Sequence, residues 1–163
     1  MAADTTKSLD GIGSGTLPDQ GIDSESTTDI DLGIDLGTTR TVVARADRGN
    51  YPVISFTDEH GDEHDFIPSL TALHEGVLIH GFAARRAAHQ GAPLLRSLKR
   101  VLTSPTLTAS TPVRLGDRTF SVLEVLTSYL RHLEAELTER GIDIARARVV
   151  VAVPAHAYGA QRL

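Results

Sequence analysis

The 163-residue sequence contains no cysteine and no tryptophan, and aromatic residues make up only 4% of it. Without cysteine the chain has no disulfide scaffold, cysteine-ligated zinc site or thiol nucleophile, and a reducing compartment is favoured. The scarcity of aromatics and the net charge of −5 argue against nucleic-acid binding. No apolar run approaches the roughly 18 residues of a membrane span, and residues 1–10 lack the apolar core of a secretory signal. We therefore expect a cytoplasmic protein with neither a membrane nor a nucleic-acid partner.

The negative charge is concentrated in the first 29 residues. They hold six acids and one lysine, a net −5, whereas residues 30–163 are neutral with 15 acids and 15 bases. Gly, Ser, Thr and Asp make up 18 of these 29 residues, and the apolar ones follow no period. Such a segment buries too little apolar surface to offset its ordering entropy. We predict a disordered acidic tail over residues 1–29, followed by one folded region.

The pattern changes at Ile30, where apolar and polar residues begin to alternate with the period of a strand. A polar turn separates this strand from a second β-branched run, which predicts a hairpin, and a third strand is expected to extend the same sheet. Further on, two Ala/Arg- or Leu-rich stretches predict short helices. The expected elements are strands at 30–36, 41–45, 51–56, 67–73 and 77–79, helices at 82–90 and 94–102, and a hairpin at 113–120.

The clearest helix is predicted over Ser121–Arg140. Ser121 and Glu124 have the spacing of a capping box, and apolar residues recur at helical intervals. The following segment, Arg148–Val153, is almost entirely apolar and predicts a strand parallel to 30–36. We expect the helix to pack on the sheet through Leu126, Tyr129, Leu130, Leu133 and Leu137. The predicted class is α/β, a mixed sheet with helices.

The best candidate for chemistry is the turn that follows Asp35. A carboxylate at a strand end is followed by Gly37-Thr38-Thr39, whose exposed amides can form an anion-binding nest that phosphate approaches closely over glycine. Asp35 could then hold a hydrated Mg²⁺ facing the same phosphates. The turn is not a Walker A loop. An ordinary hairpin turn with a solvated aspartate fits the same local composition.

Two other sets of polar residues are less informative. Lys99 could serve as a fixed cation at a phosphate site, although Lys99 and Arg100 also suit a solvated helix face. The histidines are interpreted as surface residues. His60 and His64 are four apart, but the intervening glycine and aspartate deny them a common helix face. The others are isolated in sequence, and no serine nucleophile motif occurs.

Four segments, in this order, resemble motifs of the DnaK-type 70-kDa heat-shock chaperone family, members of the actin-like ATPase superfamily with a ribonuclease H-like lobe. Gly33–Thr39 is similar to the first phosphate motif, and Ile67–Ser69 to a threonine-proline-serine strand start. Leu98–Leu102 resembles the segment with the catalytic lysine, and Val151–Ala155 with Ala160–Arg162 the valine-proline-alanine segment and its helix. Sugar kinases share only the first motif. The short connection from Leu102 to Ser121 resembles the compact HscC-like branch, with an outer subdomain trimmed to about residues 58–120.

The resemblance implies cofactors, partners and residue roles. ATP and Mg²⁺ are the implied cofactors, and unfolded clients and co-chaperones the implied partners. Asp35 would lie near Mg²⁺ through water, and Lys99 and Thr38 would take part in hydrolysis. Pro154 and Arg162 would relay the nucleotide state to a peptide-binding domain. The amides that would bind the ATP phosphates belong to Gly37, Thr38, Thr39 and Arg40.

The chain also departs from the family pattern. Arg40 stands where asparagine or tyrosine is usual, which is tolerable if only its amide is used, and residues 156–159 differ from the usual segment of the relay. The second phosphate loop, the adenosine pocket and the second lobe would lie beyond residue 163. We therefore expect the N-terminal, ATP-binding part of a chaperone ATPase, inactive by itself and prone to self-association. The alternative is a non-catalytic module that binds chaperone partners.

Overall fold

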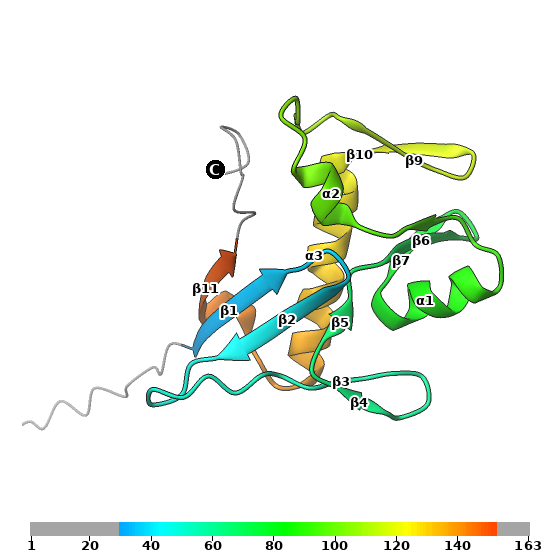
Figure 1. Ribbon diagram of the computed structural model, residues 1–163. Coiled ribbons are helices and arrows are strands. Elements are labelled where there is room, and N and C mark those ends of the chain that lie inside the picture. Colours follow the sequence, from blue (N-terminus) through cyan, green and yellow to red (C-terminus); the bar gives the residue numbers. More distant parts are fainter. Residues whose placement is uncertain (1–29, 153–163) are drawn as a thin grey trace, which may run out of the picture.

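The computed structural model describes residues 30–152, and this part of the chain is an α/β structure with one mixed four-stranded sheet, three small sheets and three α-helices. Helix α3 lies against the β1–β2 hairpin, with β3 and β4 near its C-terminal end and α2, β9 and β10 near its N-terminal end (Figure 1). The α/β class is confirmed. The strands are β1 (Ile30–Leu36), β2 (Arg40–Arg45), β3 (Phe56–Thr57), β4 (Glu63–His64), β5 (Ile67–Pro68), β6 (Thr71–His74), β7 (Val77–His80), β8 (Leu94–Leu95), β9 (Pro112–Leu115), β10 (Arg118–Ser121) and β11 (Ala147–Ala152). The helices are α1 (Gly81–His89), α2 (Leu98–Leu102) and α3 (Val122–Glu139), with a 3₁₀ turn at Ile144–Arg146.

The main sheet has the strand order β11-β1-β2-β5. The predicted hairpin of β1 and β2 is antiparallel, and β11 lies parallel to β1 with Ile30 opposite Ala147 and Asp35 opposite Ala152. The period-two pattern of β1 decides its orientation, because Leu32 and Ile34 are buried while Gly33 and Asp35 are exposed. The parallel strand predicted at the C-terminal end is confirmed as far as Ala152, and Val153 lies outside the described residues.

The third strand expected at 51–56 is wrong. Only Val53 forms a bridge to Ala44, and the fourth position of the sheet is taken by β5. Pro52 lacks an N–H donor, so this segment follows the edge of β2 through only a few hydrogen bonds. Phe56 then turns into the core, fully buried, and begins the β3–β4 hairpin.

The segment 94–102 also differs from expectation, since it is not one helix. Leu94–Leu95 pairs with β6 as strand β8, and the helix starts only after Ser97, whose side chain accepts a hydrogen bond from the Arg100 amide. The conformation of Leu94 and Leu95 is set by pairing with β6, a strand distant in sequence, and not by the helical periodicity of the segment. The single strand expected over 67–73 is wrong, because the segment divides into β5, which joins the main sheet, and β6, which pairs with β7 and β8 in another sheet. The predicted strand near 77–79, the helix near 82–90 and the hairpin at 113–120 are present, with shifted ends.

Helix α3 carries the core of the described structure. The capping box is present in full, with Ser121 and Glu124 each bonding the other's backbone amide. Of the predicted face, Tyr129, Leu133 and Leu137 are buried and Leu126 is partly buried. Leu130 is 37% exposed, which makes that prediction wrong, because the buried stripe passes through Val125 instead.

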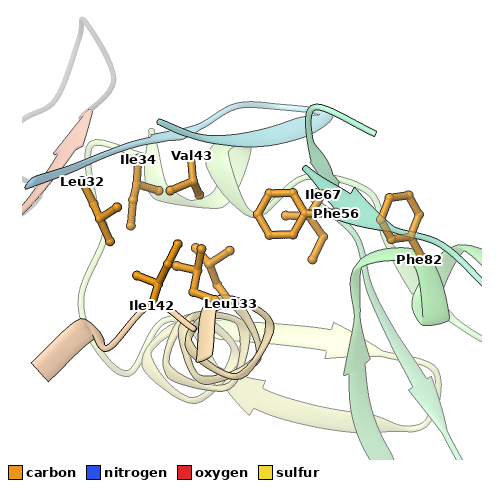
Figure 2. Close-up of a cluster of buried hydrophobic side chains, with 9 residues drawn as sticks. Leu32, Ile34, Val43, Phe56, Ile67, Phe82, Leu133 and Ile142 are labelled. Carbon is orange, nitrogen blue, oxygen red and sulfur yellow. The ribbon is translucent and has the colours of Figure 1, made fainter. Parts of the chain in front are cut away.

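Two hydrophobic clusters divide α3 along its length. The C-terminal half packs on the main sheet, where Leu32, Ile34 and Val43 point toward Leu133 and the residue Ile142 after the helix (Figure 2). The N-terminal half packs against β9, β6 and α2 through a separate cluster. Helix α3 thus joins two separately packed regions, and an outer subdomain at about 58–120 stays a prediction. Within residues 30–152, none of the helices combines the length and apolar content needed to cross a bilayer.

Candidate functional site

The turn between β1 and β2 is the centre of the candidate site. It is short because the two strands pair from Leu36 opposite Thr41, which leaves residues 37–40 to reverse the chain. The Gly37 amide donates to the Asp35 carbonyl, and a Cβ at Gly37 would lie 2.2 Å from the Arg40 carbonyl oxygen. Glycine is therefore required here by the close approach of the backbone to itself.

Helix α2 brings a cation to this turn from another part of the chain. The Lys99 ammonium lies 3.8 Å from a carboxylate oxygen of Asp35, although 63 residues separate the two in sequence. The Asp35 side chain is 62% exposed and that of Lys99 27%. Both charges thus remain accessible to a ligand, and the ion pair is too exposed to be a strong source of stability. The buried Leu98 anchors α2 below them.

The remaining predicted residues of the turn lie where a ligand could meet them. Thr38 and Thr39 are exposed at the tip. The Arg40 guanidinium stacks on the Phe66 ring, 4.4 Å from its centre, so its side chain has a partner away from the carboxylate. The other two predicted residues, Pro154 and Arg162, lie outside the described residues.

This donor set suits a phosphate with a hydrated Mg²⁺. One exposed carboxylate fits a magnesium ion that keeps most of its waters, and a lysine beside it can contact the phosphate oxygens that the ion does not. Among residues 30–152 no group of three or more potential metal-ligating side chains occurs, so a cage of protein ligands is absent from this part. The arrangement supplies one wall of a site, made by the turn and α2.

Sequence reasoning missed a buried chain of hydroxyl groups directly beneath the turn. The hydroxyl of Tyr129 lies 2.7 Å from that of Thr41, which lies 3.0 Å from that of Ser69. Thr41 is fully buried, and Tyr129 is 2% exposed. Thr41 occupies a buried position of a strand with period-two alternation. A polar side chain at such a position needs a hydrogen-bond partner, and this was the signal in the sequence that could have revealed the chain of hydroxyls.

The interpretation of the histidines as isolated surface residues is wrong for His80 and His132. His80 is 4% exposed, and its ring nitrogens are hydrogen-bonded to the hydroxyls of Thr71 and Ser128. Its ring lies 5.6 Å from that of His132. Burial, with a smaller contribution from His132, lowers the pKa of His80 to about 4. His80 is therefore neutral near pH 7.

Comparison with known proteins points to one family. No protein-family model matches the chain. Its sequence is 31% identical over 134 residues to the chaperone protein DnaK of Mesomycoplasma hyopneumoniae strain J, which covers 82% of this chain and 21% of that protein. It is 30% identical over 132 residues to DnaK of Mycoplasmopsis agalactiae (80% and 20%) and 28% identical over 135 residues to DnaK of Mycoplasmopsis synoviae (82% and 21%).

These matches support the DnaK family of 70-kDa heat-shock proteins. The chain spans about a fifth of the length of the curated relatives it matches. The mixed α/β architecture is consistent with part of an ATPase lobe of such proteins.

Proposed function

We propose that this chain carries the first phosphate-binding part of the nucleotide site of a DnaK-type, ATP-dependent protein-folding chaperone. The observation that carries the proposal is the meeting of Asp35 and Lys99 beside the glycine turn, from positions 64 residues apart in sequence. If Asp35 were only a solvated residue of a hairpin turn, nothing would require a lysine from a separate helix to lie beside it. The similarity to DnaK over four fifths of the chain supports the same assignment.

The proposed roles follow from the chemistry of each group. The amides of residues 37–40 bind the ATP phosphates, and Asp35 holds a hydrated Mg²⁺. Lys99 stabilises charge that develops on the transferred phosphoryl group, with Thr38 beside the reacting atoms. When bound, Mg²⁺ supplies neutralisation of the phosphate charge.

The finer features of this proposal concern the whole protein. They are a place in the actin-like ATPase superfamily near the compact HscC-like branch, an acidic tail over 1–29, and an outer subdomain at about 58–120. Pro154 and Arg162 take part in the relay to a peptide-binding domain. The protein acts in the cytoplasm on unfolded clients, with co-chaperones as partners.

The 163-residue chain by itself is expected to bind Mg·ATP weakly and not to turn it over. The turn and α2 contact the phosphates from one side only, and catalysis depends on groups held around the reacting atoms from several sides. Equilibrium binding and single-turnover hydrolysis should both be measured on the purified chain. Lys99→Ala should weaken Mg·ATP binding several-fold, whereas Arg100→Ala, its exposed neighbour, should change it by less than about twofold. Equal effects of the two variants, or hydrolysis at the rate of intact chaperones that Lys99→Ala abolishes, would contradict the proposal.

A second candidate, a non-catalytic binding module that also self-associates, is favoured by strand β11. In the described part of the chain β11 is an edge strand, and Val149, Val150 and Val151 are 36%, 66% and 42% exposed. An exposed, uncharged, β-branched edge is a template for pairing with another strand.

Val150→Lys is therefore expected to reduce self-association at tens of micromolar, because a charge on the edge strand opposes strand pairing. Light scattering would measure it. Val77→Lys is the matched control, since Val77 is 62% exposed but lies on β7 of a different sheet. A monodisperse monomer in the unmutated chain, or an equal gain from both variants, would be inconsistent with association through β11.

A further inference from the structure

We propose that Tyr129 is a positioning residue for the phosphate turn, acting through its hydroxyl on Thr41. The inference rests on the proposed function of the turn and adds a residue to it. The Tyr129 side chain is too deeply buried to contact a ligand directly. It is held in α3, 2% exposed, and lies below the turn rather than at its tip.

A continuous line of hydrogen bonds runs from α3 to the turn. Tyr129 bonds Thr41, the second residue of β2, and Thr41 bonds the Ser69 side chain. The backbone amide of Ser69 in turn donates to the carbonyl of Thr39, 3.0 Å away, within the turn itself. Ser69 is therefore hydrogen-bonded to the end of the turn twice, through its amide to Thr39 and through its hydroxyl to Thr41. Tyr129 bonds the Thr41 hydroxyl that takes part in the second of these contacts.

The same side chain also lies in the cluster that packs around the helix carrying the lysine. Tyr129 belongs to the hydrophobic cluster that includes Leu98 of α2. Tyr129, Thr41, Gly37 and Lys99 are among the residues that line a small cavity of about 10 Å³, which has room for no more than one water. Tyr129 therefore fixes both the turn and α2, and with them the separation at which the charges of Asp35 and Lys99 meet.

Because the chain of hydroxyls is buried, the loss of one hydroxyl is expected to weaken the hydrogen bonds of the others. Thr41 is fully buried and Ser69 is 6% exposed, so a hydroxyl that loses its partner has no access to bulk water. Removing the Tyr129 hydroxyl leaves the ring packing in place and loosens Thr41. The ordering of residues 37–40 before a ligand arrives is then lost, and this ordering is what a phosphate-binding turn contributes to affinity.

The test uses Tyr129→Phe in the full chain, with Ser128→Ala as matched control. Ser128 is the neighbouring residue on α3, and its hydroxyl bonds His80, 2.7 Å away, instead of the turn. Tyr129→Phe should weaken Mg·ATP binding about five- to tenfold, and Ser128→Ala by less than about twofold at a comparable loss of stability. Thr41→Ser, which keeps the hydroxyl, should retain affinity, whereas Thr41→Val should reproduce the loss. Equal affinities in Tyr129→Phe and Ser128→Ala, or unchanged affinity in Thr41→Val, would overturn the proposal.

A ligand-free measurement separates this inference from the proposed function. Amide hydrogen exchange of Ser69 reports its bond to the Thr39 carbonyl and needs no nucleotide. Tyr129→Phe should speed this exchange about tenfold relative to amides of α1, and Ser128→Ala should not. If unmutated protein fails to bind Mg·ATP but the exchange result holds, the proposed function is wrong and Tyr129 still positions the turn. Unchanged exchange in Tyr129→Phe would show that Tyr129 does not hold the turn.

Discussion

Leu133→Ala is expected to lower the free energy of unfolding by about 2–5 kcal/mol. Leu133 is 2% exposed and packs between α3 and the main sheet, in the cluster with Leu32, Ile34 and Val43 (Figure 2). Truncation there leaves a cavity that the sheet, held by strand pairing on both sides of β1, cannot close. Urea unfolding followed by far-UV circular dichroism would measure the change.

Leu130→Ala on the same helix is the control for this prediction. Leu130 is 37% exposed, and the same substitution should cost less than about 1 kcal/mol because water already reaches the side chain. Equal losses at the two positions would mean that α3 does not present the described face to the sheet. The pair therefore tests the packing as well as the size of the effect.

Stability is expected to fall by about 3 kcal/mol between pH 7 and pH 4 because of His80 alone. The pKa of His80 is lowered to about 4 in the folded state by burial and by His132, against an ordinary value of 6.5. Below pH 6.5 the unfolded chain therefore binds a proton that the folded chain excludes, and the loss grows until the pH reaches about 4. The groups that face His80 are the hydroxyls of Thr71 and Ser128 and the rings of His132 and Tyr129, and none of them is an anion that could stabilise the imidazolium.

The neighbouring groups define the control for this experiment. The pKa of His132 is also lowered by burial, although Glu136 and Glu139 oppose the shift. Hydrogen bonds from His64 and from the His60 amide lower the pKa of Asp58, and its contribution is lost only as pH falls below the range used for His80. His80→Gln should flatten the dependence between pH 7 and pH 4, and His74→Gln, at an exposed position, should not. An unchanged slope in His80→Gln would refute the assignment.

Local patterns were sufficient to predict the elements whose signals lie within a few residues of each other. The alternation in 30–36 and the Ser121–Glu124 capping box each specify an element through neighbours, and both are present as expected. The errors occurred where residues distant in sequence determine the secondary structure of a segment. Leu94–Leu95 has a helical composition but pairs with β6. The place beside β2 that was expected for a strand at 51–56 is occupied by β5. Leu130 sits one residue away from the buried stripe, a difference that periodicity alone does not resolve.

The residues of the candidate site likewise fall into those that local sequence could identify and those that it could not. The glycine turn after Asp35 could be recognised from composition, whereas the approach of Lys99 could be expected only through the resemblance to a family, because 63 residues intervene. Tyr129 and Thr41 are 88 residues apart, and His80 and Ser128 are 48 apart. The alternation of β2 marks Thr41 as a polar residue at a buried position, but no local pattern identifies its partner. Tyr129 and His80 therefore resemble ordinary core and surface residues in the sequence.

The most direct test of the phosphate site is an amide-resolved NMR titration of the 163-residue chain with Mg·ATP. The largest shifts are predicted for the amides of residues 37–40, with a second set in α2 around Lys99, and Lys99→Ala should reduce both. Mg·ADP should produce a similar but weaker pattern at the turn. A titration that leaves residues 37–40 unperturbed while other amides shift, for example those of Gly33 and Ala44 on the outer face of the sheet, would contradict the assignment of this turn to nucleotide phosphates.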